Sequence, residues 1–389
     1  MRFAFACLFA VFASSAQATS CGGSFTGFVE GLQAEAVSRG HSAAAAAQFL
    51  AGARQDQAVL RADRSQGHFQ RDFIDFSRRL ISSSRMQNGA RNSQQHDAVF
   101  DRIEAEMGVP RSVLLAFWAL ETDFGAVQGD FNTLNALVTL SHDCRRPELF
   151  RPQIFAALTL FERGDFDPAR TTGAWAGEIG MVQMLPADIL ENGRDGDGDG
   201  HVSLKTSPAD ALMSGGAMLR DLGWRANEPW LEEIVVPDSL DWMLTGLETT
   251  RPVSDWAAMG VQARDGDLDG VGLQASVLLP MGRNGPAFLA YPNFNVYFEW
   301  NQSFVYVTTA AYFATRLSGA NVYDAGNPPA GLPGTQMEQL QSKLQARGHD
   351  VGGVDGILGA RTRAAVQAEQ QRLGMPADAW PTAELLNRL

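Results

Sequence analysis

Apolar residues recur at helical spacing along much of this chain, and the strongest pattern covers residues 109–125. Leu114 and Phe117 fall there on one face of a predicted helix, within an otherwise unbroken apolar run. Pro110 suits a first helical turn and Gly125 is a natural stop signal. We therefore predict a helix in this segment with both of its ends marked in the sequence.

Two later segments carry the same periodicity. Residues 148–161 predict an amphipathic helix closed by Gly164, and residues 208–222 predict another with Ser207 as its N-terminal cap. Residues 22–98 are also helical in character, but they are polar and contain no catalytic signature. The first half of the chain is therefore expected to be mainly helical.

The pattern changes after residue 232. Short apolar segments such as 234–237 and 277–280 alternate with turn residues, which predicts a small β-rich insertion. The β-branched and aromatic residues 304–309 favour a strand by propensity alone. The Gly- and Pro-rich residues 326–334 predict a linker before a compact tail.

Length and composition fit a folded protein of more than one domain. The chain has 389 residues, of which 45% are hydrophobic and 19% are charged, so it is not a disordered protein. The formal net charge of -13 argues against nucleic acid as a partner, since phosphate binding needs a basic surface. No internal apolar run approaches the length of a membrane span, so we expect no transmembrane segment.

The N-terminal residues resemble an export signal. A basic residue precedes the apolar stretch 3–13, and the small residues 16–18 form a cleavage site, so residues 1–18 are predicted to be a signal peptide. A cytosolic chain with an apolar N-terminal strand is the alternative. After cleavage, Cys21 and Cys144 are expected to form one disulfide in an oxidising compartment. A lipid on Cys21 is disfavoured because the preceding residues lack the usual leucine.

Glu121 is the candidate catalytic residue because it ends the apolar run of residues 109–125. Burial disfavours an ionised carboxylate and raises its pKa. A carboxylic acid that keeps its proton near neutral pH is what a general acid for glycoside cleavage needs. A structural glutamate bound by backbone amides is an equally weighted interpretation of this segment alone.

Residues 195–203 resemble the start of an EF-hand calcium loop. Acidic residues stand at alternate positions and Gly200 supplies the sharp turn at position six, but Thr206 replaces the usual acidic residue at position twelve. The expected metal ligands are Asp195, Asp197, Asp199, His201 and Asp210. A solvated acidic turn is the alternative. The similar residues 265–270 have no acidic closing residue nearby and are expected to be a plain turn.

Taken in order, the motifs of this chain resemble the lytic murein transglycosylase B family over roughly residues 22–320. The motifs are Glu-Thr-Asp-Phe-Gly at 121–125, and the segments 143–147, 175–186, 195–203, 285–294 and 300–303. The tail is similar to a peptidoglycan-binding module. That second resemblance rests on Leu340, Gln341, Gly348, residues 354–359, Thr362, Ala365, Gln370 and Gly374.

The resemblance implies a mainly α fold of α+β type. A lysozyme-like catalytic core would carry a small inserted β-subdomain, and a small three-helix peptidoglycan-binding domain would follow. It also implies that Phe304 to Leu317 form a helix, against their β propensity. The implied segments are a signal peptide (1–18), a catalytic domain (19–325) with its insertion at about 232–285, a linker (326–334) and the binding domain (335–389).

The implied reaction is non-hydrolytic cleavage of the β-1,4 bond between N-acetylmuramic acid and N-acetylglucosamine. Glu121 would protonate the departing oxygen and then, as a carboxylate, take the proton of the muramoyl C6 hydroxyl, which leaves a 1,6-anhydro ring. The sequence offers no obvious second carboxylate, and Asp123 would face away on a helix. A lysozyme-type hydrolase and a non-catalytic wall-binding protein are the alternatives.

The resemblance also assigns substrate-binding residues. Gln183 would line the cleft and Asn301 would bind the sugar, although both could instead be capping residues. Gly177 and Gly180 would let the backbone approach the glycan. Trp175 and Tyr297 complete the predicted set. The chain departs from the family pattern at Ala174, Glu178, Glu369 and Ala379.

The expected partners follow from the same resemblance. We expect a periplasmic monomer that acts on peptidoglycan glycan strands, with possible cell-wall enzyme complexes. No cofactor would be required for the chemistry, and a structural calcium ion is the one expected addition.

Overall fold

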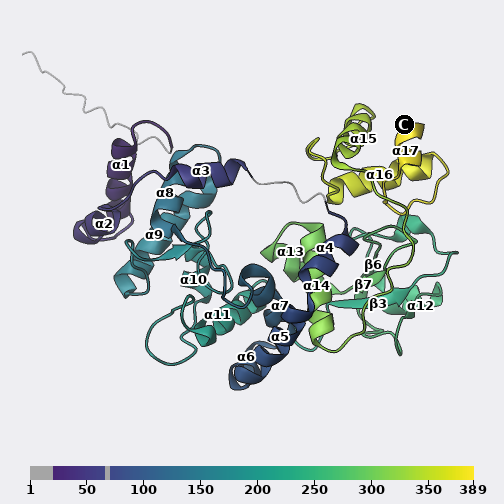
Figure 1. Ribbon diagram of the computed structural model, residues 1–389, viewed down its shortest axis with the longest axis horizontal. Coiled ribbons are helices and arrows are strands. Elements are labelled where there is room, and N and C mark those ends of the chain that lie inside the picture. The colour runs from purple at the N-terminus through teal and green to yellow at the C-terminus, as the bar shows by residue number, and fades with distance from the viewer. Residues whose placement is uncertain (1–20, 66–70) are drawn as a thin grey trace, which may run out of the picture.

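The computed structural model describes residues 21–65 and 71–389, and Figure 1 shows their arrangement. The predicted signal peptide, residues 1–18, lies outside the described residues. Within the described ranges, no helix combines the length and the apolar character needed to cross a membrane.

Helices dominate the part of the chain that precedes the sheet. They are α1 (Phe25–Ser38), α2 (Ala43–Leu50), α3 (Gln57–Arg64), α4 (Phe73–Leu80), α5 (Ser83–Gln95), α6 (Asp97–Met107), α7 (Arg111–Thr122), α8 (Thr133–His142), α9 (Pro147–Arg163), α10 (Pro186–Asn192) and α11 (Pro208–Asp221). The short strands β1 (Phe131–Asn132) and β2 (Thr172–Gly173) pair antiparallel beside α8.

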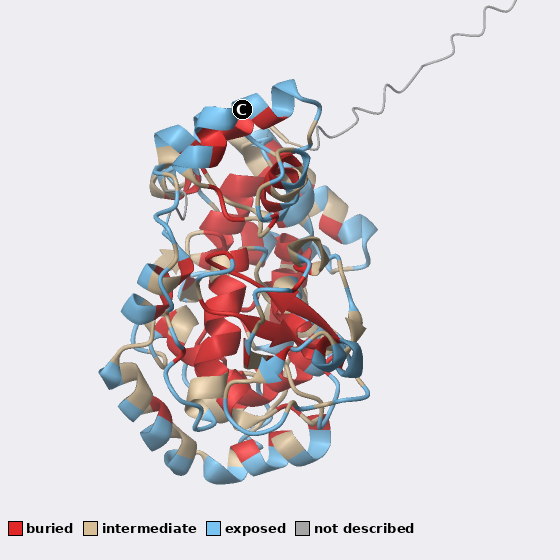
Figure 2. Cartoon of the chain, turned by 90° about the vertical axis from the view of Figure 1, so that its right-hand side faces the viewer, coloured by how far each residue is buried: buried red, intermediate tan, exposed pale blue. Residues whose placement is uncertain are grey.

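Helix α7 lies at the centre of the molecule. It packs against α14 (Phe304–Leu317), α5, α6 and α11 (Figure 1). Every residue from Ser112 to Ala119 is buried, which agrees with the unbroken apolar run in the sequence. The buried residues cluster in this central region and the peripheral helices are exposed (Figure 2). The predicted helix is confirmed, with Pro110 as its N-cap rather than its first helical residue.

Other predicted helices are also present. Helix α9 ends at Gly164, which has a positive φ of 88°, and Ser207 caps α11 by accepting from the amide of Asp210. Helix α14 spans Phe304–Leu317, as the family resemblance implied and against local propensity. Almost all of its residues up to Ala314 are buried, so contacts on every face override the β preference of single residues.

The predicted β-rich insertion is a five-stranded antiparallel sheet in the order β4-β6-β7-β3-β5. It has its own core, in which Trp256, Val277 and Leu289 are completely buried. Two small helices and α13 accompany the strands. The elements are β3 (Leu231–Val235), η1 (Trp242–Leu244), β4 (Arg251–Pro252), α12 (Val253–Ala258), β5 (Gln262–Ala263), β6 (Gln274–Leu278), β7 (Phe288–Ala290) and α13 (Pro292–Trp300).

The tail forms a small helical domain of α15 (Gly334–Ala346), α16 (Ala360–Arg372) and α17 (Ala383–Arg388). In Figure 1 it lies beside the sheet and α13. Leu340, Leu344 and Val366 are fully buried in a core of their own. The fold is therefore mainly helical with small sheets, as predicted.

Two departures from the family pattern are accommodated in this tail. The carboxylate of Glu369 is 4% exposed, and it pairs with Arg372 at 2.7 Å and with His349 at 2.9 Å. Ala379 has a φ of 60°, a left-handed conformation that glycine adopts more easily. Its amide donates to Gln370 Oε1 at 2.9 Å, which fixes the turn.

Candidate active site

Glu121 stands in the last turn of α7, where the chain changes direction. Asp123 and Phe124 follow with φ values of 52° and 60°, so the helix cannot continue. The hydroxyl of Thr122 donates to the carbonyl of Met181 at 2.7 Å. This bond joins the end of α7 to the loop of the 175–186 motif.

Two donors hold one oxygen of the Glu121 carboxyl group. Tyr306, from the first turn of α14, donates its hydroxyl to Oε1 at 2.5 Å. Trp300, at the end of α13, donates its indole N–H to the same oxygen at 3.1 Å. The indole ring also stacks on Phe117, with ring centroids 4.3 Å apart, so its position is fixed by α7 itself. Among the described residues, none donates a hydrogen bond to Oε2 of Glu121.

The surroundings raise the pKa of Glu121. Burial is the largest cause, because it disfavours the charged form, and the nearby carboxyl group of Glu178 adds to it. The hydrogen bonds from Tyr306 and Trp300 oppose the rise without cancelling it. Glu121 therefore keeps its proton to a higher pH than an exposed glutamate does.

The hydrogen bonds also distinguish the two oxygens of the acid. A protonated carboxyl group has one carbonyl oxygen, which accepts hydrogen bonds, and one hydroxyl oxygen, which donates. Because both donors point at Oε1, that atom is best suited to be the carbonyl oxygen of the acid form. This arrangement favours the proton on Oε2, which has no hydrogen-bond partner among the described residues.

A second carboxyl group lies within electrostatic range, although the sequence offered no obvious one. Glu178 belongs to the 175–186 motif, and burial raises its pKa as well. Its Oε2 is buried without a hydrogen-bond partner among the described residues. Asp123, by contrast, forms an ion pair with Arg85 at 3.0 Å and does not share the site.

The motif loop owes its shape to unusual backbone conformations. Gln183 has a φ of 53°, and its side-chain amide donates to the carbonyl of Gly180 at 2.8 Å. Gly177 and Gly180 have φ values of 95° and 80°. A Cβ atom at Gly177 would lie 2.4 Å from Leu137. Packing within the protein therefore accounts for this glycine, and its approach to a glycan stays a prediction.

The other predicted substrate residues differ in accessibility. Asn301 lines a cavity of about 840 Å³, and its Oδ1 accepts from the amide of Ser303 at 2.9 Å, so it also caps the following turn. Trp175 is partly buried against the main core. Tyr297 is 0% exposed and stacks on Phe117 at 5.0 Å. The prediction for Tyr297 is wrong, because a fully buried ring cannot contact a substrate.

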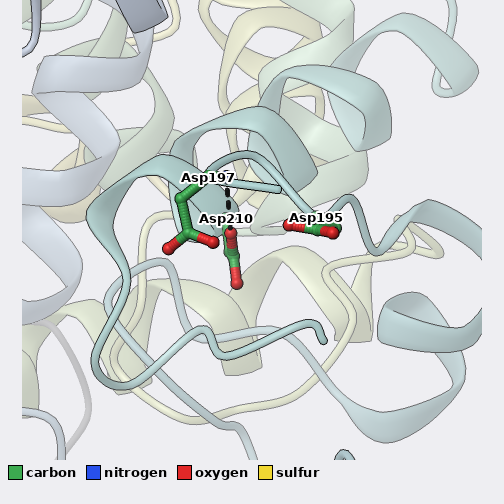
Figure 3. Close-up of side chains that lie close together, drawn as sticks. All are labelled: Asp195, Asp197 and Asp210. Atoms are coloured by element: carbon green, nitrogen blue, oxygen red, sulfur yellow. Dashed lines mark hydrogen bonds between the residues drawn. The ribbon is translucent and has the colours of Figure 1, made fainter. Parts of the chain in front are cut away.

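Three of the predicted metal ligands converge beside α11. Ligand atoms of Asp195, Asp197 and Asp210 all lie within 4.8 Å of one another (Figure 3). Asp210 is fully buried and accepts the amides of Gly196 at 2.8 Å and Ser203 at 2.7 Å. Such a set of carboxylate oxygens suits a hard cation such as calcium.

The remaining two predicted ligands lie apart from this cluster. Asp199 accepts the amide of His201 at 2.8 Å, and the His201 ring pairs with Asp165 at 2.9 Å. The side chains of Asp199 and His201 are therefore engaged in contacts outside the cluster. Among the described residues, the similar loop at 265–270 belongs to no group of potential metal ligands.

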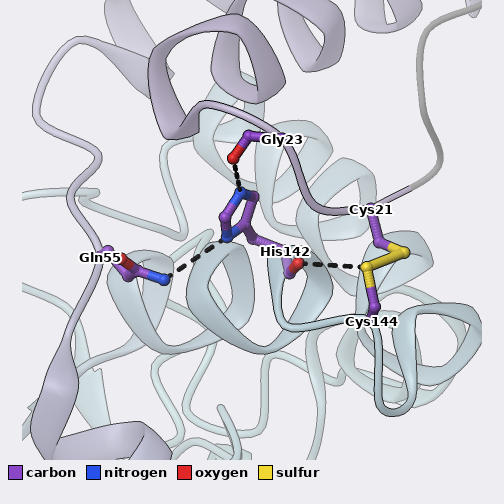
Figure 4. Close-up of a disulfide and its surroundings, with 5 residues drawn as sticks. All are labelled: Cys21, Gly23, Gln55, His142 and Cys144. Carbon is purple, nitrogen blue, oxygen red and sulfur yellow. Dashed lines mark hydrogen bonds between the residues drawn. A yellow bond between two sulfur atoms is a disulfide. The ribbon is translucent and has the colours of Figure 1, made fainter.

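The predicted disulfide between Cys21 and Cys144 is present, with Cα atoms 5.2 Å apart (Figure 4). It connects the segment before α1 to the turn between α8 and α9. His142 lies beside the bridge, and its ring contacts the carbonyl of Gly23 at 3.1 Å. In the same turn, Arg145 pairs with a buried aspartate at 2.6 Å, so covalent and ionic contacts fix this region together.

Comparison with known proteins identifies the family. The family model described as "Transglycosylase SLT domain" matches residues 24–315, which is most of the chain. The chain belongs to this family. It is a lytic transglycosylase of peptidoglycan, as the resemblance implied. A second model, "Putative peptidoglycan binding domain", matches residues 333–389 of this transglycosylase, so the tail prediction is also confirmed.

Solved structures support the assignment. SltB3 from Pseudomonas aeruginosa, in complex with NAG-anhNAM-pentapeptide, is 36% identical. The match has a TM-score of 0.87 and covers 94% of this chain and 99% of that one. Lytic transglycosylase Slt35 of Escherichia coli, in complex with calcium, is 25% identical with a TM-score of 0.66, over 78% of this chain and 97% of that one.

Among curated proteins, membrane-bound lytic murein transglycosylase B of Escherichia coli is 27% identical over 233 residues. This match covers 59% of the transglycosylase described here and 63% of that relative's length.

Sequence reasoning missed two contributors to the site of this transglycosylase, Tyr306 and Trp300. Trp300 opens one of the quoted motifs, so a signal was present for it. Tyr306 had no signal beyond its place two residues after Phe304, in a segment whose propensity favoured a strand. The family resemblance implied a helix there, but helical periodicity alone does not tell which side chain reaches Glu121.

Proposed function

We propose that this transglycosylase cleaves the β-1,4 bond between N-acetylmuramic acid and N-acetylglucosamine, with Glu121 as its only acid and base. The observation that carries the proposal is the half-buried Glu121 carboxyl group, whose Oε1 accepts two hydrogen bonds while its Oε2 is left for the substrate. The relative SltB3 was solved with an anhydro-muramoyl product, which supports the same outcome here.

The proposed reaction has two proton transfers at one atom. Oε2 of Glu121 gives its proton to the glycosidic oxygen, the bond from C1 to that oxygen breaks, and positive charge develops at C1. The Glu121 carboxylate then takes the proton of the muramoyl C6 hydroxyl, and the C6 oxygen forms a bond to C1. The products are a free 4-hydroxyl on N-acetylglucosamine and a 1,6-anhydro-muramoyl end, and no water is consumed.

Tyr306 and Trp300 support both halves of this reaction. Their hydrogen bonds to Oε1 stabilise the carboxylate that exists between the two transfers, and charge-assisted bonds of this kind are the stronger ones. Burial favours the protonated acid before the reaction. The balance lets one carboxyl group act first as an acid and then as a base.

We propose that Gln183 and Asn301 bind the sugars on either side of the scissile bond. The carbonyl oxygen of the Gln183 amide is free to accept from a substrate, since the donor nitrogen bonds Gly180. Asn301 uses its Oδ1 within the protein, which leaves its NH₂ group as a donor. Trp175, Gly177 and Gly180 would line the same cleft.

Mass analysis of products tests this proposal. Glu121→Gln should reduce the release of anhydro-muropeptides from purified sacculi by about 10²- to 10⁴-fold. Asp123→Asn is the matched control, because Asp123 is ion-paired outside the site. The assay also distinguishes a hydrolase, whose product is heavier by one water. Substantial anhydro product from Glu121→Gln would refute the role of Glu121. A hydrated product from the wild type, together with loss of catalysis in Glu178→Gln, would favour a two-carboxylate hydrolase.

We also propose a structural calcium ion at Asp195, Asp197 and Asp210. Three carboxylates within 4.8 Å repel one another, and a divalent cation would offset this repulsion. The likeness to Slt35, which was solved in complex with calcium, supports the choice of metal. The ion would join the loop to α11 and would take no part in catalysis. Calorimetric titration of calcium into chelator-treated protein tests the site, and absence of binding heat would contradict it.

We propose a periplasmic location and peptidoglycan glycan strands as the partner. The predicted export signal at residues 1–18 and the disulfide between Cys21 and Cys144 both suit an oxidising compartment. A sulfur in a disulfide is not available for a lipid, so lipid anchoring at Cys21 is not part of the proposal. Fractionation of cells that express the full chain, with mass analysis of the mature N-terminus, tests the location.

A further inference from the structure

The C-terminal domain shares buried side chains with the catalytic domain. Trp380 is 4% exposed and belongs to the main core of the molecule, although it comes from the tail. Its indole N–H donates to the carbonyl of Pro329 at 2.9 Å, and a Cβ atom at Gly282 would lie 2.6 Å from Trp380. The C-terminal domain is therefore packed against the catalytic domain and is not attached through the linker alone.

Arg363 is the most unusual residue of this interface. It lies on α16, and its guanidinium group is buried between the domains, which lowers the pKa of Arg363 to about 10. One Nη donates to the carbonyl of Pro280 at 2.8 Å, and the other to that of Leu279 at 3.5 Å. Among the described residues, no carboxylate forms an ion pair with Arg363, and its Nε has no hydrogen-bond partner.

Arg363 also contacts two aromatic rings: that of Phe304 from the catalytic domain, and, at 5.9 Å from the guanidinium carbon to the ring centroid, that of Trp380 from its own domain. The guanidinium carbon lies 4.5 Å from the centroid of the Phe304 ring, within the range of a cation–π contact. A buried cation without a carboxylate is expensive, and such contacts with π systems and carbonyl groups become stronger when water is excluded. The interface therefore places a desolvated charge directly against the first residue of α14.

Phe304 is close in the sequence to residues of the catalytic site. The preceding residue, Ser303, caps α14 by accepting from the amide of Tyr306 at 3.4 Å, and its own amide donates to Asn301. Tyr306 then donates to Glu121. The contact between the domains is thus separated from the acid by only the first turn of α14.

We propose that Arg363 is a positioning residue for catalysis: by holding Phe304, it fixes the start of α14 and with it the hydrogen bond from Tyr306 to Glu121. The C-terminal domain is then a structural part of the active site as well as a wall-binding module. This inference rests on the proposed role of Glu121.

The interface offers a matched contact that does not involve α14. Gln367 also lies on α16, one helical turn after Arg363, and its amide donates to the carbonyls of Trp242 at 2.9 Å and Thr245 at 3.1 Å. Gln367 thus attaches the same helix to the β-rich insertion. Substitution of Gln367 should weaken the contact between the two domains while the contact between Arg363 and Phe304 remains.

The experiment uses the full chain and a short, soluble, peptide-free glycan, which removes any need for wall anchoring. Arg363→Met should lower kcat by about tenfold, with a smaller change in KM. The hydrogen bond from Tyr306 lowers the pKa of Glu121, so its loosening should move the alkaline limb of the pH–rate profile to higher pH. Arg363→Lys should recover part of kcat, and Gln367→Ala should retain both kcat and the pH profile.

Other outcomes overturn the inference. An unchanged kcat on the short glycan, with lower activity on sacculi alone, would mean that the C-terminal domain acts only as an anchor. Equal losses in Arg363→Met and Gln367→Ala would assign the effect to docking as a whole. If Arg363→Met does not fold, Phe304→Leu removes the same contact from the other side and should show the same pH shift, and an unshifted profile in that variant would refute the proposal.

A double-mutant cycle gives an independent check. Combining Arg363→Lys with Phe304→Leu should cost less than the sum of the two single effects on kcat, because both remove one contact. Additive effects would contradict the coupling. The role of Glu121 is tested separately by Glu121→Gln in the same assay, so failure of the proposed function is distinguishable from failure of this inference.

Discussion

At the scale of single residues, the sequence identifies the acid but not the groups that control it. Glu121 is visible because it ends an apolar run, which is a local signal. Trp300 and Tyr306 are 179 and 185 positions away, so only the packing of α13 and α14 on α7 brings them to Glu121. Tyr297 and Tyr306 look alike in the sequence. Tyr297 stacks on Phe117, whereas Tyr306 donates a hydrogen bond to Glu121, and no local sequence pattern distinguishes the two positions.

Tyr306→Phe tests the control of the acid by its neighbour. Without the hydroxyl, the Glu121 carboxylate loses a hydrogen bond that lowers the pKa of Glu121, so that pKa should rise further. A hydrogen bond to a charged group is worth about 1.5–3 kcal/mol, which corresponds to a loss of roughly 10- to 100-fold in kcat/KM at neutral pH. A pH–rate profile checks the direction, because the alkaline limb should move to higher pH.

Tyr297→Phe is the matched control for that experiment. Its hydroxyl is buried and has no hydrogen-bond partner among the described residues, so removing it should leave kcat/KM and the pH profile unchanged. A shift of the alkaline limb in the control, or its absence in Tyr306→Phe, would show that the assignment of roles to the two tyrosines is incorrect.

At the scale of elements, the helices were predictable where caps and apolar periodicity agree. Gly164 ends α9 and Ser207 begins α11 through local contacts that a sequence displays directly. The acidic loop at residues 195–203 was predictable only in part. An EF-hand template assigns ligands at alternate positions, but Asp199 instead accepts the amide of His201, and the His201 ring pairs with Asp165. The path of the backbone after a turn decides which side chains converge, and sequence spacing does not encode it.

The three-carboxylate cluster predicts a stability effect of calcium. At a calcium concentration about 100 times the Kd, binding stabilises the folded protein by about 2.7 kcal/mol. Calcium should therefore raise the thermal midpoint of the wild type by a few degrees, and Asp197→Ala should remove most of that rise. Differential scanning fluorimetry with calcium and with chelator measures both values.

Asp199→Ala provides the comparison at the same loop. Since Asp199 lies outside the cluster, this variant should keep the calcium-dependent rise. Identical melting curves for the wild type with calcium and with chelator would identify the loop as an acidic turn without a metal.

At the scale of the whole molecule, the sequence indicates the parts but not how they are joined. The apolar patterns predict a helical core, a β-rich insertion and a separate tail, and the structure contains all three. The Gly- and Pro-rich residues 326–334 predict a linker. In the structure, the amide of Asn327 donates to the carbonyl of Asn284 at 2.8 Å, and Trp380 holds Pro329. The position of residues 326–334 is therefore determined by contacts with residues far away in the sequence, and no local sequence pattern predicts such contacts.

The disulfide predicts the behaviour of the N-terminal helices. Its two cysteines are 123 positions apart, and a chain-entropy model gives such a loop roughly 4 to 5 kcal/mol of stabilisation at most. Reduction should therefore lower the thermal midpoint, while kcat of the still-folded protein changes little, because Glu121 lies outside the bridged turn. The exported protein should contain no free thiol.

A thiol count on the unfolded, unreduced mature protein decides the point. Two reactive cysteines would mean that the bridge is not formed in the exported protein, and one would indicate modification of the other. The double variant Cys21→Ser/Cys144→Ser should reproduce the lower midpoint of the reduced wild type.

The arrangement of donors on Oε1 has a consequence for how the site exchanges protons with water. In the proposed reaction, Oε2 releases a proton and later regains one, so the enzyme ends each cycle in its starting ionisation state. The proton that enters the departing sugar is replaced by one from the other sugar. A site that recycles its proton in this way needs no route to bulk solvent between turnovers. Glu121 can therefore stand half-buried at the end of α7, whereas a hydrolase must admit a water molecule to its site in every cycle.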